Sequence, residues 1–163
     1  MKNNILILGA DGYIGSALSM HFPEAELWDC KWFGRDKPKN ANLYWKSEIE
    51  KYNTIIYLAG LSSVSSCVNL STALKNNVVH FDDLLKIIGN NQKLIYASSG
   101  SVYGNNGGKF GSEDSNVKHS LTNYDMGMLN RESLSKKAIS AGKKVYGLRF
   151  GTVAGCLDGP KIS

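Results

Sequence analysis

The sequence predicts an α/β fold, in which a mostly parallel sheet of about six strands is covered on both faces by helices. Two observations predict it. Short apolar runs rich in β-branched residues alternate with longer stretches whose apolar residues recur at three- and four-residue steps. Runs such as Ile55-Ile56-Tyr57-Leu58 also lack polar alternation, which indicates strands that are buried on both faces.

The apolar runs define the expected strands, several of them too short and too β-branched for a helix: Ile5–Leu8, Glu26–Cys30, Asn42–Trp45, Thr54–Leu58, Lys93–Ala97 and Lys144–Arg149. Helical spacing between them predicts helices over Tyr13–His21, Ser71–Ile88 and about Asn123–Ala141. The second of these carries one apolar face, formed by Leu74, Val78, Phe81, Leu84, Leu85 and Ile88. The Gly-rich, polar stretch Gly104–Thr122 is expected to be a loop, of a length that is usually functional or mobile.

Length and composition favour one domain over residues 1–163. The chain has 163 residues, 42% hydrophobic and 20% charged, which excludes a disordered tail, a collagen-like repeat and a coiled coil. No apolar run approaches the ~18 residues of a membrane helix, and the apolar start is too short for a signal peptide. Cys30, Cys67 and Cys156 lack the spacing of metal ligands, so we expect a reduced, cytoplasmic protein without a bound metal.

The basic charge balance has two readings. Lys and Arg number 19 against 14 Asp and Glu, a formal net charge of +5. Many of the lysines form short scattered pairs without the interleaved aromatic residues of single-strand binders, which favours a solvated surface over a nucleic-acid site. An anionic small molecule fits the charge equally well.

A glycine motif, Gly9-Ala-Asp-Gly12-Tyr-Ile-Gly15, follows the first strand and opens the first helix. In this context Gly9 permits a tight turn, Gly12 lets the backbone approach a diphosphate, and Gly15 lets helix and strand pack closely. The diphosphate would lie on the unpaired N–H groups of the helix N-terminus. The sequence therefore predicts a Rossmann-type dinucleotide site.

An acidic residue at the end of the second strand selects between the two nicotinamide dinucleotides. Asp29 stands there and is suited to the ribose 2′-OH of NAD. Arg35, a few residues later, would instead meet the 2′-phosphate of NADP. We favour NAD, with NADP as the alternative.

A serine and a tyrosine are candidates for the chemistry. Ser99 ends the strand that contains Tyr96, and ligands of open α/β sheets bind outside the carboxyl ends of strands. Tyr124 follows near a helix start. The two hydroxyls could share a substrate hydroxyl or carbonyl, with Tyr124 exchanging a proton while the cofactor exchanges a hydride.

These motifs together resemble the extended short-chain dehydrogenase/reductase family, in particular its NAD-dependent sugar-nucleotide epimerases and dehydratases. The resemblance rests on the three motif glycines and on Tyr57-Leu-Ala-Gly60, Asn77-Val78, Ser98-Ser99-Gly-Ser-Val-Tyr-Gly104, Tyr124 and Leu148-Arg149-Phe-Gly-Thr-Val-Ala-Gly155. It covers nearly the whole chain, as the family's N-terminal cofactor domain. The resemblance thus implies that the family's C-terminal substrate domain is absent from these 163 residues.

The resemblance also implies roles for individual residues. The backbone of Tyr13 and Ile14 would cover the diphosphate, and the substrate would be oriented by Ser99, with Tyr124 as acid and base. The remaining cofactor contacts would be Leu58, Ala59 and Gly60 on the adenosine side, Asn77 and Ala97 near the nicotinamide, and Phe150 and Gly151 closing over it, followed by Thr152. Related proteins dimerise through long helices, which makes a homodimer an expectation.

The family motif Tyr-x-x-x-Lys is broken, because Met128 stands where the lysine belongs. That lysine binds the nicotinamide ribose and favours the ionised tyrosine, whereas Met supplies neither charge nor donor. Arg131, about two turns beyond Tyr124, would be a poor replacement.

We therefore expect an impaired NAD-dependent enzyme acting on a sugar nucleotide or a related hydroxyl or carbonyl substrate. The alternative is an inactive NAD(P)-binding module, as sensor or partner subunit. Gly100 and Ser101 replace the Asp-Glu pair of the 4,6-dehydratases, which argues against that reaction.

Overall fold

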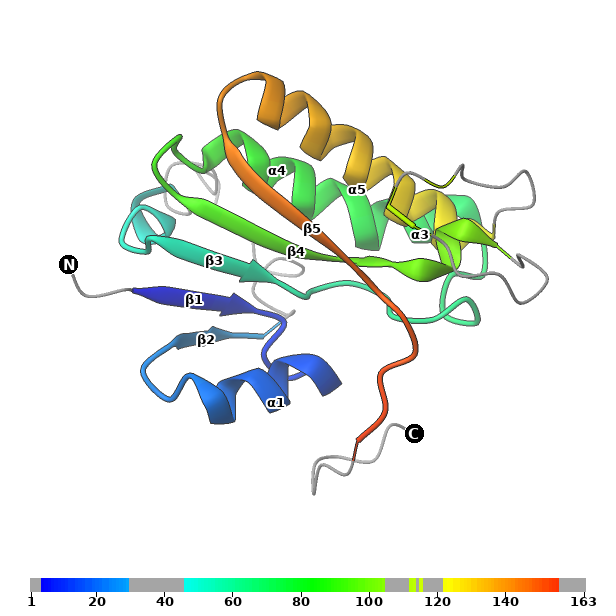
Figure 1. The fold of residues 1–163 in the computed structure, drawn as a ribbon, viewed down its shortest axis with the longest axis horizontal. Coiled ribbons are helices and arrows are strands. Elements are labelled where there is room, and N and C mark those ends of the chain that lie inside the picture. Colours follow the sequence, from blue (N-terminus) through cyan, green and yellow to red (C-terminus); the bar gives the residue numbers. More distant parts are fainter. Residues whose placement is uncertain (1–3, 30–45, 105–111, 114, 116–121, 156–163) are drawn as a thin grey trace.

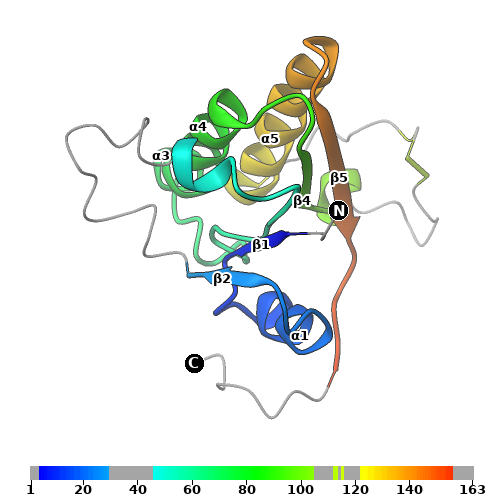
Figure 2. The same cartoon turned by 90° about the vertical axis from the view of Figure 1, so that its left-hand side faces the viewer.

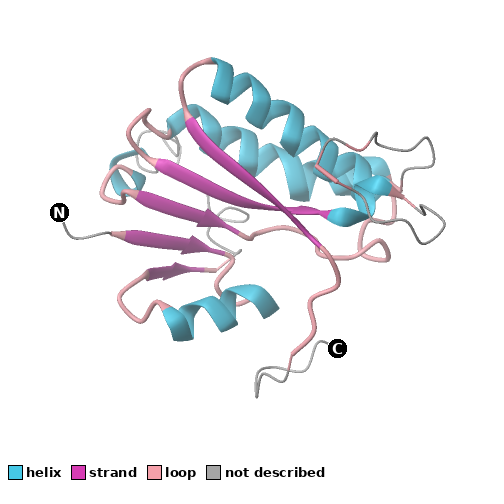
Figure 3. Ribbon diagram, in the orientation of Figure 1, coloured by secondary structure: helices cyan, strands magenta, loops and turns pink. Residues whose placement is uncertain are grey.

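A computed structural model describes residues 4–29, 46–104, 112–113, 115 and 122–155 of the chain. Within these residues the strands form one five-stranded, all-parallel sheet in the order β2-β1-β3-β4-β5 (Figures 1 and 3). The strands are β1 (Ile5–Leu8), β2 (Glu26–Trp28), β3 (Thr54–Tyr57), β4 (Lys93–Ser99) and β5 (Lys144–Phe150). The order reverses at β1, because β2 pairs with one edge of β1 and β3 with the other.

Helices cover both faces of the sheet. Helix α1 (Tyr13–His21) lies on one face, and the helices that follow β3 and β4 lie on the other (Figure 2). The second group consists of α3 (Leu70–Leu74), the π-helical turn η2 (Lys75–Val79), α4 (His80–Ile87) and α5 (Asn123–Ser140), with the 3₁₀ turn η3 (Gly100–Tyr103) leading away from β4. This is the doubly wound α/β fold that the sequence predicts.

The main core lies between the sheet and the helices α4 and α5. Alternate residues of each strand face it, as the two-residue period of a strand requires. Its buried members include Leu6, Leu8, Ile55, Tyr57, Phe81, Leu84, Leu94, Tyr96, Ala138 and Val145. Strands β1 and β3 are buried on both faces, which explains why they read as continuous apolar runs, whereas most of β5 is exposed.

Several element boundaries differ from the sequence prediction, most of them by one or two residues. Strand β2 ends at Trp28, so Asp29 follows the strand, and β4 runs on to Ser99. The helix predicted over Ser71–Ile88 contains the π-helical turn Lys75–Val79, which apolar spacing did not reveal. The predicted sixth strand, Asn42–Trp45, and most of the stretch 104–122 lie outside the described residues.

Candidate functional site

The candidate site lies at the carboxyl ends of the strands, and its first wall is the glycine turn after β1. Gly9 has a φ of +84°, and its N–H donates to the carbonyl of Trp28 at 2.8 Å. A Cβ at Gly9 would come within 2.7 Å of the backbone nitrogen of Ala59. The turn is therefore wedged between the ends of β2 and β3, and only a glycine fits there.

The start of α1 packs on this turn. A Cβ at Gly15 would lie 2.7 Å from the Cα of Ala10, so the helix approaches the turn backbone to backbone. Gly12 is the N-cap and provides no side-chain hydrogen bond to the helix, whose first N–H groups have no partner within it. A Cβ at Gly12 would meet only the Gly9 carbonyl, at 3.4 Å. This cradle of backbone donors fits the diphosphate of a dinucleotide.

Asp29 lies beside the same turn. The carbonyl of the preceding residue, Trp28, accepts hydrogen bonds from the N–H groups of both Gly9 and Ala10. Asp29 is half-buried there and directly follows β2. Its contact with the ribose of NAD stays a prediction. Arg35, the alternative that would favour NADP, lies outside the described residues.

The segment after β3 forms the next part of the wall, and Asn77 fixes it. The buried Asn77 side chain accepts from the Leu61 N–H at 2.7 Å and donates to the Leu61 carbonyl at 3.3 Å. Gly60 has a φ of +134°, and a Cβ there would meet both the Asn77 side chain and the guanidinium of Arg131. Leu58, Ala59 and Gly60 thus lie between the glycine turn, which packs on Ala59, and the side chains of Asn77 and Arg131.

Arg131 is a residue whose place the sequence did not reveal. It projects from α5 into the interior with 2% of its surface exposed. Its guanidinium donates to the carbonyls of Ala59 (2.7 Å), Ala97 (3.2 Å) and Asn77. Burial lowers the pKa of this side chain, although tyrosines nearby oppose that shift.

A chain of hydrogen bonds runs from Ser99 to Asp125, the residue after Tyr124. The Ser99 and Ser101 hydroxyl oxygens are 2.8 Å apart, and Ser101 donates to the Asp125 carboxylate at 2.5 Å. Asp125 is buried in the first turn of α5, directly after Tyr124. The hydrogen-bond chain from Ser99 therefore ends one residue away from Tyr124, and ties η3 to the start of α5.

The segment after β5 closes another side. Phe150 is the register partner of Ser99, which places Phe150 and Gly151 beside the candidate serine. From there the chain passes the strand ends and runs to α1 (Figure 1), where the Tyr13 hydroxyl donates to the Gly155 carbonyl at 2.7 Å. Tyr13 thus fastens this segment over the glycine turn.

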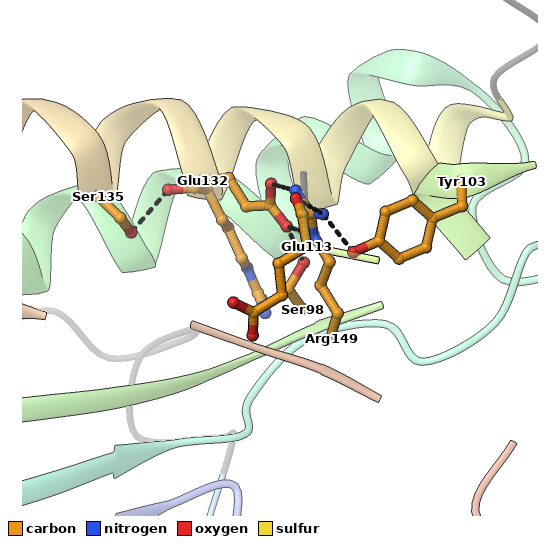
Figure 4. Close-up of polar contacts among 7 residues, drawn as sticks. Ser98, Tyr103, Glu113, Glu132, Ser135 and Arg149 are labelled. Carbon is orange, nitrogen blue, oxygen red and sulfur yellow. Dashed lines mark hydrogen bonds and ion pairs between the residues drawn. The ribbon is translucent and has the colours of Figure 1, made fainter. Parts of the chain in front are cut away.

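A charged network supports the serine strand from the side. Glu132 on α5 and Arg149 on β5 face each other at 2.6 Å, with Ser98 donating to the carboxylate at 2.7 Å and Arg149 donating to the Tyr103 hydroxyl at 2.6 Å (Figure 4). Burial alone would raise the pKa of Glu132, but the hydrogen bonds from Arg149 and Ser98 outweigh it and hold the pKa below its ordinary value.

The sequence analysis did not reveal four features of the site: the Glu132–Arg149 network, the roles of Ser101 and Asp125, and the burial of Arg131. One signal was present: Thr122-x-x-Asp125 has the spacing of a helix-capping pair. Within the described residues no cluster of His, Cys, Asp and Glu is arranged to hold a metal, and none of the helices is long and apolar enough to cross a membrane.

Solved structures share this fold. The UDP-Glc/GlcNAc 4-epimerase of Campylobacter jejuni superimposes with a TM-score of 0.76 at 22% identity, over 96% of this chain and 56% of that one. The dTDP-4-dehydrorhamnose reductase of Yersinia enterocolitica gives 0.78 at 20% identity, over 98% and 56%. The UDP-glucuronic acid 4-epimerase of Bacillus cereus, solved with NAD, gives 0.73 at 19% identity, over 91% and 57%.

The chain spans about half the length of these structures. No curated protein matches it in a comparison of sequences. The family model described as "NAD dependent epimerase/dehydratase family" matches residues 5–161, nearly the whole chain. With the glycine turn, the parallel sheet and the strand-end hydroxyls at one edge, the chain belongs to the NAD-dependent epimerase/dehydratase family.

Proposed function

We propose that this chain binds NAD and is the coenzyme half of an oxidoreductase that acts on a sugar nucleotide or a related hydroxyl or carbonyl substrate. One observation carries the proposal: the glycine cradle and the Ser99 hydrogen-bond chain lie at the same edge of the sheet. The names of the structural neighbours support the substrate class, because they are a UDP-sugar epimerase with NAD and a dTDP-sugar reductase.

The coenzyme would be held by the backbone at Gly12, Tyr13 and Ile14 and by Asp29 at its adenosine ribose, with Ala59 and Gly60 below it. When bound, NAD accepts a hydride from the carbon that bears a hydroxyl group. The roles of Asn77, Ala97, Phe150 and Gly151 as further coenzyme contacts are part of the same proposal. Their placement at or beside the carboxyl ends of β3, β4 and β5 supports it.

Hydrogen-bond direction gives Ser99 a defined part. The single hydroxyl proton of Ser101 is donated to the Asp125 carboxylate, so the Ser99 hydroxyl must be the donor in the bond between the two serines. The Ser101 N–H donates to the Ser99 oxygen at 3.2 Å, so one further lone pair is left with which Ser99 would accept a hydrogen bond from a substrate hydroxyl. We propose that Tyr124, in its phenolate form, takes the substrate proton as the hydride leaves the carbon that bears the hydroxyl.

Met128 limits this chemistry. Its side chain is 2% exposed and offers no donor to a ribose hydroxyl. We propose that turnover is impaired for this reason. The same observation favours the second candidate function, an inactive NAD(P)-binding module that acts as a sensor or as the partner of another chain.

Calorimetric titration with NAD and with NADP tests the binding function. We expect micromolar binding with preference for NAD. The Gly12→Ala variant should fold normally but bind about tenfold more weakly, since its methyl group stands where the diphosphate approaches. Gly89→Ala is the matched control, because a Cβ there meets only the Gln92 side chain, at 3.7 Å. A chain that binds neither dinucleotide at millimolar concentration would contradict the proposal.

Single-turnover assays separate the two candidate functions. The chain, saturated with NAD, is mixed with UDP- and dTDP-sugars, and the absorbance of reduced nicotinamide is followed. Slow reduction that disappears in Tyr124→Phe and in Ser99→Ala would support the enzyme. Tight NAD binding without reduction by any sugar nucleotide would support the inactive module.

Self-association is a further part of the proposal. Large apolar side chains are exposed on and before the helices, namely Val68, Leu70, Val79 and Ile139. Sedimentation velocity should show a dimer that dissociates in Val79→Asp; a monomer at all concentrations would contradict it. A cytoplasmic location stays a prediction from the cysteine pattern.

A further inference from the structure

Arg131 is a buried cation without a carboxylate partner. It is 2% exposed, and none of the ion pairs among the described residues includes it. Its partners are three backbone carbonyls, and its guanidinium also lies over the rings of Tyr57 (5.1 Å) and Phe81 (5.7 Å). Removing a charge from water costs several kcal/mol, which a neutral side chain in the same space would avoid.

The three carbonyls come from three different segments of the candidate site. Ala59 follows β3, Ala97 lies near the end of β4, and Asn77 belongs to the π-helical turn. The guanidinium fork therefore sets the spacing between two strand ends and a helix. It also reaches the glycine turn indirectly, because Gly9 packs on the backbone of Ala59.

Arg131 lies one helical turn beyond Met128, and both side chains are buried. A lysine at position 128 would add a second buried cation one turn away from the first. Like charges at this spacing repel each other, more strongly where water is excluded. The arginine and a lysine at position 128 are thus alternatives for one electropositive position.

We propose that Arg131 is the positioning residue of the proposed coenzyme site, and that it supplies, from one turn further along α5, the positive charge that the chain lacks at position 128. This inference rests on the proposed binding of NAD. Arg131 acts through Ala59, Asn77 and Ala97, whose backbone it orients, and through the field of its charge on an anionic coenzyme. Since its guanidinium is buried, it does not replace the hydrogen bond that a lysine would give the ribose.

NAD affinity tests the role in binding. Arg131→Met removes the charge and the fork, and Arg131→Lys keeps the charge alone. Kd is measured by calorimetry at low and high salt, in conditions where circular dichroism shows each variant folded. We expect Arg131→Met to bind about tenfold more weakly at low salt and Arg131→Lys to fall between it and the unaltered chain.

Lys143→Met is the matched control. Lys143 also donates only to carbonyls, those of Leu85 (2.5 Å) and Ile88 (2.8 Å), but it precedes β5 and lies at the opposite ends of the strands. Its loss should lower stability and leave Kd unchanged. If Arg131→Met and Lys143→Met both keep the original Kd, Arg131 is a structural residue and the inference is wrong.

Hydrogen exchange provides a readout that needs no coenzyme. The Leu61 N–H is bonded to the Asn77 side chain, and its exchange rate should rise in Arg131→Met and stay the same in Lys143→Met. If the unaltered chain binds no NAD, the proposed function is wrong and the role of Arg131 in binding falls with it. Its positioning of the three backbone segments then stands if the Leu61 N–H exchanges faster in Arg131→Met and is overturned if it does not.

Moving the cation tests whether the two positions are alternatives. Met128→Lys should lower the midpoint of thermal unfolding, and the double variant Met128→Lys/Arg131→Met should recover part of that loss. Arg131→Met is therefore measured in two backgrounds, the unaltered chain and Met128→Lys. If it lowers the stability equally in both, the two cations do not compete and this part of the inference is wrong.

Discussion

The glycine turn and helix α5 shape the candidate site in different ways. The turn does so through glycines, which have no side chain, and α5 through polar side chains that hydrogen-bond inside the protein. Gly9 and Gly15 pack backbone to backbone, and the turn offers N–H groups. On α5, Asp125, Arg131 and Glu132 hold neighbouring segments through hydrogen bonds. The glycine turn thus depends on close backbone packing, and α5 on charged and polar hydrogen bonds. An added methyl group should therefore disturb the first, and the loss of a charge the second.

The largest effect is expected for Gly15→Ala. The added Cβ would meet the backbone of Gly9 and Ala10, at 2.7 Å from the Ala10 Cα, and neither can move without opening the turn. We expect a loss of about 3 kcal/mol in the free energy of unfolding, at the upper end for overpacking. Urea denaturation measures it, and Gly12→Ala, which has more room, should lose much less. Equal losses in both variants would show that space does not define this wall.

Glu132→Gln should come next, and it probes the charged wall. It leaves the Arg149 guanidinium, which is 21% exposed, without its carboxylate. We expect a loss of about 2 kcal/mol at neutral pH. Because the folded state holds the pKa of Glu132 below its ordinary value, this carboxylate stabilises the fold above that value and ceases to do so as the pH falls through the lowered pKa.

Denaturation of both proteins at a series of pH values checks the sign. The difference in stability between the unaltered chain and Glu132→Gln should be largest at neutral pH and shrink from about pH 5 downwards. A stability difference that stays constant down to pH 3 would mean that the negative charge of Glu132 does not stabilise the fold.

Asp29→Ala sharpens the comparison at the ribose end of the glycine wall. If Asp29 accepts hydrogen bonds from the NAD ribose, its loss should weaken NAD binding about tenfold, or roughly 1.4 kcal/mol. NADP binding should weaken less or improve, because a negative charge beside the 2′-phosphate is removed. Parallel titrations with both dinucleotides measure this, and equal losses for the two would place Asp29 away from the ribose.

The two walls also differ in how far the sequence predicted them. The glycine turn is encoded locally, in three glycines between a strand and a helix, so its position and partner strand are predictable. The other wall joins residues far apart in sequence: Arg131 contacts Ala59, 72 residues away, and Asn77, 54 away. Neither hydrophobic periodicity nor the secondary-structure propensity of a residue indicates contacts between residues so far apart in the sequence. The π-helical turn that carries Asn77 also breaks the 3.6-residue period on which the helix prediction depends.

Thr122→Ala should have the smallest effect on stability and the most local one. Thr122 is the N-cap of α5, and the Asp125 carboxylate accepts from its N–H at 2.9 Å and from its hydroxyl at 2.7 Å. Losing the hydroxyl should cost about 1 kcal/mol, as for other caps. Asn69→Ala removes the equivalent cap of α3, where the side chain accepts from the Thr72 N–H, and should cost about as much.

The two cap variants differ in what the lost group touches. Asp125 also accepts from Ser101, which in turn is bonded to Ser99, so only Thr122→Ala leaves a partner of the serine chain less well held. The Ser101 N–H donates to Ser99 at 3.2 Å, and its exchange rate should therefore rise in Thr122→Ala and stay the same in Asn69→Ala. Equal exchange in both would mean that the cap and the serine chain are independent, and that the orientation of Ser99 does not depend on the start of α5.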